Sequence, residues 1–491
     1  MVIAIAQPLS AQSSHIRPAA PGLNEAGTPY FEITSPVALG LSTSPTDLQP
    51  LPDGRILALS DREVAIGDGT RWEIHRLDPA DAAARSTQLA VAADGSIYTG
   101  IPGGLARLDF QADGTLHRTI VAQTPNPVMM PATVTKAGDQ WYWYGGVGEV
   151  IRWKPGSQPL HSGKISDLER AIMLGGDVYL SDRSDGSFWR ETTSGLERLI
   201  AARDTNVSNT VTCGIDLGGG DYVVGTNGHG LQHFEKGHLA PIRSSGPLAG
   251  LSRINDLCSA GDGLFAAAID NLGIVFFDRQ LRTIQVLDRS LDHRLARVRR
   301  IFATRVGTVW GLLNDGVVCV EFPSRISHYE SMVSTGLIFA QPYRFQGRLW
   351  LIGDGQAQRG VYDTNGRLLR FDVDTPPDEF LGALSTETGA LLAGGRRGLY
   401  RLENDTWRLV LPGLTNPHLR TAPDAEGRWA FIAEGAAGWL RPSGDSYEVT
   451  STPVPALGSV YGSITDARGV LWAELGVARI ARLELTPGAP R

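Results

Sequence analysis

The sequence has few cysteines, no excess of basic residues and no long apolar run. Its three cysteines among 491 residues, Cys213, Cys258 and Cys319, are too few for a disulfide framework, and we expect buried, inert thiols on strands. Acidic residues outnumber basic ones, 52 to 45, which argues against nucleic acid as a partner. No stretch approaches the roughly 18 apolar residues of a membrane helix.

Helical periodicity is missing as well. The nearest candidate, residues 291–300, alternates arginine with apolar residues as a strand does. Glycine (58) and proline (29) are abundant, as a chain with many tight turns requires, and 42% of the residues are hydrophobic. These features predict an all-β globular protein.

A glycine recurs along the chain at steps of roughly 40 residues. A polar or glycine residue precedes most of these positions, and a short apolar run follows each of them, for example RILALS (55–60) and LFAAAI (264–269). A third run then follows, as in GIVFFDR (273–279). The repeated positions are Gly54, Gly95, Gly138, Gly176, Gly220, Gly263, Gly307, Gly347, Gly389, Gly427 and Gly469.

A divergent unit of about 40 residues with four short strands is typical of a β-propeller blade. Eleven such units exceed the four to eight blades that usually close a ring. We therefore predict a seven-bladed propeller over residues 30–331 and a second, incomplete propeller of about four blades over 332–491. Residues 1–29 are expected to be a disordered lead or a remnant signal.

Both ends of the chain give further expectations. Residues 2–6 are apolar and Leu9-Ser10-Ala11 resembles a cleavage site, although no basic segment precedes them, so we expect a periplasmic or extracellular location. The last unit lacks an outermost strand. Residues 30–34 (YFEIT) alternate as an outer strand should, and we predict that they pair near residues 478–483. Alternatively, the first ring, a second copy of the chain or sequence downstream of Arg491 covers the last units.

Three segments, GLYRLEND (398–405), VVGTNGHGLQHFE (223–235) and SIYTGIPGGLARLD (96–109), resemble the repeat of the two-component regulator propeller family. The resemblance covers nearly the whole chain and implies an extracytoplasmic, ligand-sensing region. In that family two seven-bladed propellers precede an immunoglobulin-like domain, a membrane helix and a signalling module such as a histidine kinase. The sequence departs from this pattern, because it contains no membrane helix and no kinase motif.

The resemblance implies a non-catalytic sensor, with glycan fragments as a candidate ligand. A polysaccharide-acting propeller lyase or hydrolase and a protein-interaction scaffold are the alternatives. The expected partners are an oligosaccharide or other small ligand, a histidine kinase or membrane signalling partner and a second copy of the chain. No cofactor is expected.

Candidate ligand-binding residues lie in the loops that join second to third strands, because loops on a rigid scaffold commonly carry function. These residues are Asp182, Arg183, Asn227, His229, Asp270, Asn271, Asn314 and Asp315. For a metal, His229 and His233 of the segment that runs to His238 would be about 13 Å apart on a strand, too far to share one ion. No nucleophile elbow is present.

Two further groups have both a functional and a structural interpretation. Arg294, Arg297, Arg299 and Arg300 would form an anion site if they face one blade interface, and are otherwise solvated or ion-paired. The aromatic strand Trp141-Tyr142-Trp143-Tyr144 would stack on a sugar, or else fill the interior of a blade.

Overall fold

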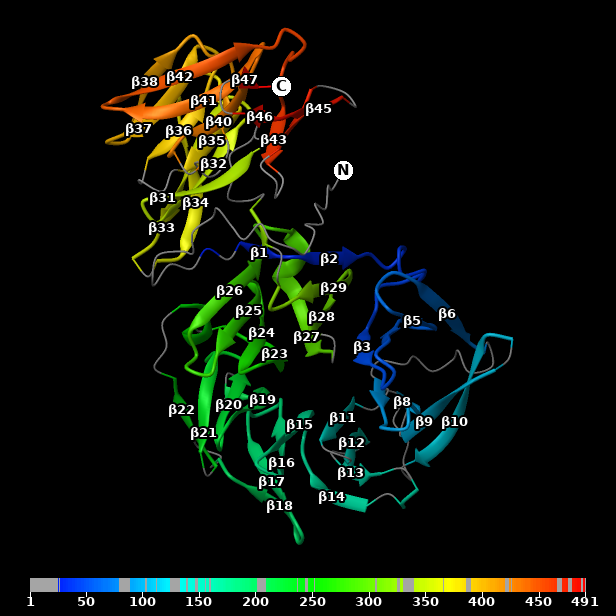
Figure 1. The fold of residues 1–491 in the computed structure, drawn as a ribbon. Helices are drawn as coiled ribbons and strands as arrows, with labels where there is room; N and C mark the ends of the chain where they lie inside the picture. Colours follow the sequence, from blue (N-terminus) through cyan, green and yellow to red (C-terminus); the bar gives the residue numbers. More distant parts are fainter. Residues whose placement is uncertain are drawn as a thin grey trace. The chain divides into compact units, whose positions relative to one another are not determined.

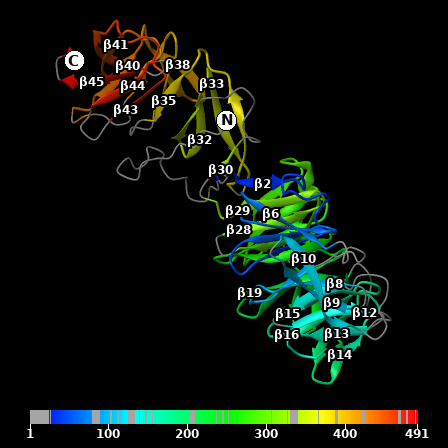
Figure 2. The same cartoon turned by 90° about the vertical axis from the view of Figure 1, so that its right-hand side faces the viewer.

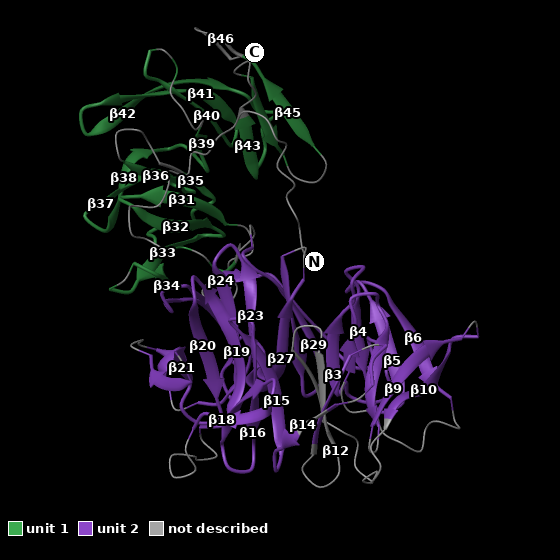
Figure 3. Ribbon diagram, turned by 90° about the horizontal axis from the view of Figure 1, so that it is seen from below, with its two compact units in different colours: residues 1–27, 328–491 green, residues 28–327 purple. Residues whose placement is uncertain are grey.

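The chain divides into two compact units in the computed structural model. One, the ring unit, spans residues 28–327; the other, the stack unit, combines residues 1–27 with 328–491 (Figure 3). The structure describes residues 25, 27–78, 89–101, 104–111, 113–123, 133–137, 140–145, 149–154, 156–158, 160–200, 209–235, 237–242, 246–250, 252–304, 307–324, 327–329, 340–364, 366–385, 390–419, 424, 426–465, 470–475, 479–486 and 489–490.

The regular structure of the described residues is nearly all β-strand, joined by turns and loops, which confirms the predicted all-β class. Two 3₁₀ turns, η3 (Pro247–Ala249) and η4 (His293–Arg297), lie among the described residues, and no described helix could cross a membrane. The segment 291–300 was expected to be a strand throughout. It instead begins with η4, because the Asp292 carboxylate accepts the Arg294 N–H and caps the turn.

The ring unit contains one eight-stranded and five four-stranded sheets, which follow one another around a ring (Figure 1). The eight-stranded sheet arises because the outer strands β6 and β10 of two meanders pair in parallel. The strands of the whole ring unit are β1 (Thr28–Pro29), β2 (Phe31–Thr34), β3 (Asp47–Pro50), β4 (Ile56–Leu59), β5 (Glu63–Gly67), β6 (Trp72–Leu77), β7 (Leu89–Val91), β8 (Ile97–Ile101), β9 (Gly104–Phe110), β10 (Thr115–Gln123), β11 (Thr133–Ala137), β12 (Gln140–Gly145), β13 (Glu149–Trp153), β14 (Leu160–Lys164), β15 (Leu168–Leu174), β16 (Asp177–Asp182), β17 (Phe188–Thr192), β18 (Gly195–Arg198), β19 (Val211–Gly218), β20 (Asp221–Thr226), β21 (Leu231–Glu235), β22 (His238–Pro241), β23 (Ile254–Gly261), β24 (Leu264–Ile269), β25 (Gly273–Asp278), β26 (Thr283–Asp288), β27 (Val298–Ala303), β28 (Thr308–Leu313) and β29 (Gly316–Glu321), with β30 (Ser327–His328) at the boundary.

The recurring glycine has a conformational cause. Its described copies all lie in the turn between the first and second strand of a sheet and have positive φ, which costs glycine little and other residues more. The values are 91° at Gly54, 88° at Gly95, 90° at Gly176, 85° at Gly220, 74° at Gly263, 79° at Gly307, 77° at Gly347 and 73° at Gly427. Gly138, Gly389 and Gly469 lie outside the described residues.

The ring is closed by a strand from the start of the unit. β2 pairs antiparallel with β29, Ile33 opposite Val318, and so completes the sheet of β27, β28 and β29. The prediction that residues 30–34 pair near 478–483 is therefore wrong. The first and last sheets of the ring also pack directly, with Trp72 edge to face on Trp310 at 6.1 Å between ring centroids.

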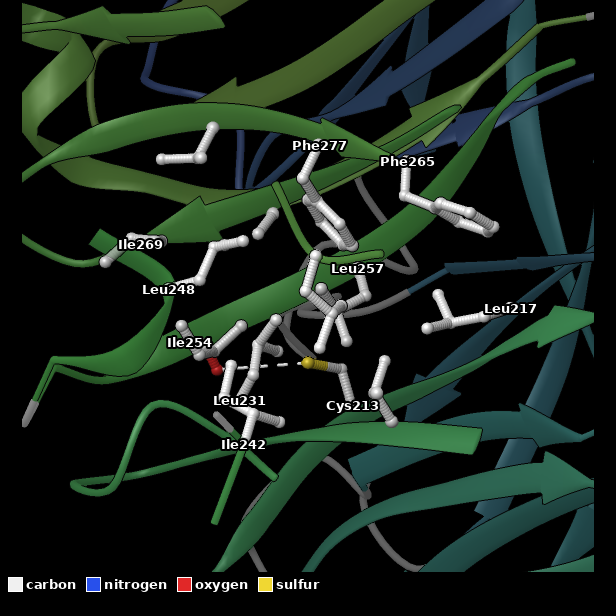
Figure 4. Packing of buried hydrophobic residues seen from close by; sticks show 14 residues of the cluster. Cys213, Leu217, Leu231, Ile242, Leu248, Ile254, Leu257, Phe265, Ile269 and Phe277 are labelled. Atoms are coloured by element: carbon white, nitrogen blue, oxygen red, sulfur yellow. Dashed lines mark hydrogen bonds between the residues drawn. The ribbon is translucent and has the colours of Figure 1, made fainter. Parts of the chain in front are cut away.

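Neighbouring sheets bury both faces of their middle strands. Between the β19–β22 and β23–β26 sheets, Phe265 and Phe277 stack at 5.6 Å and lie in one cluster with Cys213 and Ile254 (Figure 4). This explains why β24 is apolar on both sides rather than alternating.

The stack unit contains four sheets that pack in sequence order, which Figure 2 shows as a row from β32 to β45. Three sheets have four strands and the last has three described strands. The strands are β31 (Gln341–Phe345), β32 (Arg348–Gly353), β33 (Gln356–Tyr362), β34 (Leu368–Asp374), β35 (Gly382–Ser385), β36 (Leu391–Gly394), β37 (Gly398–Glu403), β38 (Thr406–Pro412), β39 (His418–Leu419), β40 (Trp429–Ala433), β41 (Ala436–Ser443), β42 (Ser446–Pro453), β43 (Gly462–Thr465), β44 (Leu471–Glu474) and β45 (Ile480–Leu483), followed by the hairpin β46 (Leu485–Thr486) and β47 (Ala489–Pro490).

Candidate functional site

The ring unit encloses an axial cavity of about 670 Å³. Its described walls are the first strands β3, β7, β15, β19, β23 and β27, which each turn one backbone edge toward the axis. Ala90, Ala171 and Gly214 are among the residues that line the cavity. Among the described lining residues Phe302 is the one aromatic side chain, while Arg170, Asp256 and Arg300 are the charged ones.

A β-bulge recurs near the start of four successive first strands. Each bulge places one extra residue between an apolar residue and the next ladder partner. The extra residues are Glu169, Thr212, Asn255 and Arg299, which follow one another at steps of about 43 positions.

Three bulged side chains connect one sheet to the next. The Thr212 hydroxyl donates to the carbonyl of Ile254, and the Asn255 amide donates to the carbonyl of Val298 at 2.8 Å. The Arg299 guanidinium similarly reaches the Thr46 carbonyl at 3.4 Å. We call the four extra residues and the residue that follows each of them the girdle. These residues connect successive sheets at one end of the cavity.

Two ion pairs form the floor of the cavity at the girdle. Arg170 Nη1 lies 2.6 Å from Asp256 Oδ1, and Asp256 Oδ2 also accepts the backbone N–H of Ile301 at 3.2 Å. Burial alone would lower the pKa of Arg170, but the adjacent Asp256 carboxylate outweighs it, so this pKa is raised. The arginine therefore stays charged inside the ring.

The second floor pair repeats this design. Arg300 Nη1 contacts Asp47 Oδ1, and Asp47 Oδ2 accepts the Leu89 N–H at 2.6 Å. Each aspartate thus binds an arginine and the backbone of the following first strand. Cys213 occupies the corresponding place between Arg170 and Asp256, and burial raises the pKa of its thiol to about 12.

At its other end the cavity reaches the turns between first and second strands. Pro52, Gly54 and Ala93, all exposed, belong to the lining there. The cavity thus opens at the face that carries the turns between first and second strands, which we call the turn face. It ends at the two ion pairs of the floor. Such a floor offers donors and acceptors to a polar ligand without requiring a ligand of one charge.

The eight residues predicted to bind a ligand lie on the opposite side, between second and third strands. None of them is among the residues that line the cavity. Asp182 is buried and holds its own loop, accepting the N–H groups of Ser166 and Ser184, each at 2.8 Å. Arg183 pairs with Asp167 at 2.9 Å.

The remaining predicted residues belong to the same surface. Asn227 accepts from Arg253 at 3.0 Å, and Asn271 donates to Asp270 at 2.9 Å. Asp315 accepts from the Ser44 hydroxyl at 3.3 Å. His229 lies in the β20–β21 loop and Asn314 in the β28–β29 turn, both at this surface. The structure brings these residues to one face but assigns them no common pocket.

The other candidate groups are separated or paired. His233 lies on β21, 3.2 Å from Asp221, while His238 lies on β22. The part of the chain that the structure describes holds no group of three potential metal ligands. Arg294 pairs with Asp292 at 2.7 Å, and Arg297 belongs to η4, so it does not share a strand face with Arg299 as predicted.

Trp141-Tyr142-Trp143-Tyr144 form β12 as expected, but their side chains lie outside the described residues. Sequence reasoning noticed Arg300 and missed Arg170, Asp256 and Asp47. A usable signal was present: an apolar residue followed by two mostly polar ones opens four first strands, as LER (168–170), VTC (211–213), IND (254–256) and VRR (298–300).

Comparison with known proteins supports the fold. No protein family and no curated protein matches the sequence. The solved extracellular domain described as that of the hybrid two component system BT3049 from B. thetaiotaomicron is similar, with a TM-score of 0.61 and 14% identity over 90% of this chain and 64% of that one. This chain thus spans less than two thirds of that domain.

Two weaker matches are the extracellular domain described as that of the hybrid system BT4673 from B. thetaiotaomicron and virginiamycin B lyase from Staphylococcus aureus. The first has a TM-score of 0.47 and 14% identity over 94% of this chain and 72% of that one. The lyase has a TM-score of 0.46 and 12% identity over 59% and 99%. At 14% identity the likeness to the BT3049 domain concerns the fold alone; with the four-stranded sheets described above, it shows that the chain is a propeller-like, nearly all-β protein.

Proposed function

We propose that this chain is the extracytoplasmic, non-catalytic ligand-binding region of a two-component type of sensor. On this proposal the ring unit is a seven-bladed propeller and the stack unit contains four blades of a second one. The axial cavity carries the proposal, because it combines a size suited to a small ligand with a floor of positioned charges. The extracellular sensor domain with a similar fold adds support.

The ligand enters from the turn face and its polar groups meet Arg170, Asp256 and Arg300 at the floor. The exposed backbone edges of the first strands supply further donors and acceptors along the walls. Oligosaccharide fragments, which present hydroxyl groups in every direction, suit such walls. A histidine kinase or another membrane signalling protein would read the bound state.

Two tryptophan substitutions distinguish the two faces of the ring. Ala93→Trp places a large side chain at the exposed rim of the cavity, whereas Asn314→Trp places the same side chain on the opposite surface. Wild type and both variants are incubated with a panel of oligosaccharides, and the melting temperature and any product are measured. We expect a ligand-induced rise in melting temperature without product, lost in Ala93→Trp and kept in Asn314→Trp.

Each other outcome contradicts a defined part of the proposal. Loss of the shift in Asn314→Trp alone would assign binding to the loops that join second to third strands. Product formation would favour a polysaccharide lyase or hydrolase. Absence of both shift and product across the panel would favour a protein-interaction scaffold.

A further inference from the structure

The Arg170–Asp256 ion pair at the floor of the axial cavity joins sheets that are not neighbours. β19 lies between β15 and β23 in the ring (Figure 1), yet Arg170 of β15 contacts Asp256 of β23 directly, at 2.6 Å. An ion pair that bypasses a strand in this way must pass on the axial side of that strand. The two side chains therefore extend across the channel in front of β19.

A second bridge lies behind the floor, on the side away from the cavity. The Glu169 carboxylate accepts from Arg253 at 3.1 Å and so joins the β15 sheet to the segment that enters β23. Arg253 is also fixed by the side-chain oxygens of Asn227 and Asn255, at 3.0 and 2.9 Å. None of these four residues lines the cavity. Among the described strands, two layers of paired side chains thus close this end of the channel.

The described side walls of the cavity offer few hydrogen-bonding side chains. Apart from the floor charges and the Cys213 thiol, Gln49 and Thr304 are the polar side chains among the described lining residues. The Gln49 amide donates to the Leu89 carbonyl at 3.3 Å, and the Thr304 hydroxyl shares a hydrogen bond with that of Thr308 at 2.7 Å. The backbone edges along the walls bind polar groups of many kinds, so selectivity by side chains is concentrated at the floor.

The floor arginines have further donors. Arg170 and Arg300 each use one nitrogen in the described hydrogen bonds to Asp256 and Asp47, whereas a guanidinium carries five N–H groups. The two arginines and two aspartates leave the floor without net charge. A neutral group rich in hydroxyl oxygens, such as a sugar unit, can accept from these N–H groups without leaving a buried charge unpaired.

We infer that the cavity binds a neutral oligosaccharide by one end, an inference that rests on the proposed ligand-binding function. The terminal sugar unit lies at the floor, and the chain leaves through the turn face. On the β27 side the described lining runs from Arg300 to Thr304, a depth of about 13 Å at 3.3 Å per residue. An internal segment of a longer chain would have to enter doubled back on itself, because the floor lets no end pass through. The ligand is therefore recognised by its end and not by its repeat.

Blocking one end of the ligand at a time tests this inference. Each panel oligosaccharide that raises the melting temperature is capped at its reducing end by reductive amination with an aromatic amine, and separately at its other end by a cyclic acetal on the terminal sugar. For chains longer than the cavity, one cap should weaken binding about tenfold or more, because the terminal unit loses hydrogen bonds at the floor. The other cap should change the affinity by less than about twofold, since that end lies in solvent.

The outcomes distinguish end recognition from ligand binding itself. If no panel oligosaccharide raises the melting temperature, the ligand-binding function fails, and end recognition fails with it. If oligosaccharides bind but both caps weaken binding equally, or neither does, the ligand-binding function stands and end recognition is overturned.

Chain length gives an independent measurement. Calorimetric titration with fractions of increasing length from a binding series should give one protein per chain throughout. The dissociation constant per mole of chain should level off once the chain reaches the rim of the cavity, because a longer chain offers no additional end. Several proteins bound to one long chain, or an affinity that keeps rising in proportion to length, overturns the inference.

Arginine-to-lysine variants test the floor. Arg170→Lys keeps a charge beside Asp256 but replaces the planar guanidinium donors with a single ammonium nitrogen. This variant should fold, as its ligand-free melting temperature reports, and should bind the ligand about tenfold more weakly. The matched control is Arg55→Lys, because Arg55 pairs with the exposed Asp53 at 2.8 Å and does not line the cavity. Wild-type affinity in a folded Arg170→Lys variant, or equal weakening by Arg55→Lys, overturns the inference.

Discussion

At the scale of single residues, the floor of the cavity is where charge and packing are most closely linked. Asp256 is the only carboxylate recorded beside Arg170 among the described ion pairs, and it also accepts the N–H of Ile301. Removing it would leave the half-buried guanidinium of Arg170 and the buried N–H group of Ile301 without this acceptor. Loss of this carboxylate therefore lowers stability more than loss of an exposed ion pair does.

We expect Asp256→Ala to lower the free energy of unfolding of the ring unit by about 3 kcal/mol. Urea unfolding, together with hydrogen exchange of the β23 amides, measures the loss. Glu73→Ala, an exposed carboxylate on β6, should change stability by less than about 0.5 kcal/mol. A double variant, Arg170→Leu with Asp256→Leu, should recover part of the loss; if it does not, the ion pair is not the cause.

At the scale of elements, the sequence predicted strands well and their distant partners poorly. The glycine repeat located the first turn of nearly every described sheet, because that turn requires a positive φ. The strand at residues 30–34 was also predicted, since its alternation is local. Its partner was not, because which edge it completes depends on the closure of the whole ring rather than on YFEIT itself.

The girdle illustrates the same limit. Bulges leave only a faint trace in the sequence, an extra polar residue, and their contacts join sheets that are about 43 residues apart. The predicted loop residues followed from the expected loop positions. The cavity floor, in contrast, depends on side chains from first strands that converge only in three dimensions.

The closing strand gives a prediction at this scale. Ile33 on β2 packs against the cluster that contains Val318, while Glu32 points away and is exposed. Ile33→Asp should speed hydrogen exchange of the β29 amides at Val317–Val320, because a carboxylate in that cluster weakens the pairing. Exchange at Ile480–Leu483 should not change, and Glu32→Gln should leave both segments unaffected. Faster exchange in β45 would instead support the pairing of residues 30–34 with residues 478–483.

At the scale of the whole molecule, the chain passes from one unit to the other twice. Residues 1–27 belong with 328–491, so the ring unit is entered after residue 27 and left after residue 327. Glu25 fixes the first passage within the stack unit, where Arg344 and Tyr362 bind its carboxylate. Burial by itself raises the pKa of Glu25, but these hydrogen bonds and the charge of Arg344 outweigh it and lower the pKa below 4.5.

This shift predicts a pH dependence. A carboxylate whose pKa is lower in the folded than in the unfolded state stabilises the fold at pH values above its unfolded-state pKa. This contribution is lost as the pH falls through its folded-state pKa. We expect Glu25→Gln to lower the melting temperature of the stack unit at pH 7, with the difference from wild type shrinking below about pH 4.5. Calorimetry from pH 3 to 7 tests this. A difference in melting temperature that is independent of pH would show that the packing of the Glu25 side chain, and not its charge, stabilises the stack unit.

The pairing of β2 with β29 also sets an order in time. Ile33 leaves the ribosome about 285 residues before its partner Val318, which at 5–20 residues per second is about 15–60 s. During this interval the first strand of the ring has no partner, and the sheets made after it cannot close around the axis. The floor pair between Arg300 and Asp47 must also wait for the same late segment. A nascent chain therefore holds an open row of sheets until residues 298–321 are made, and the axial cavity forms in one step after them.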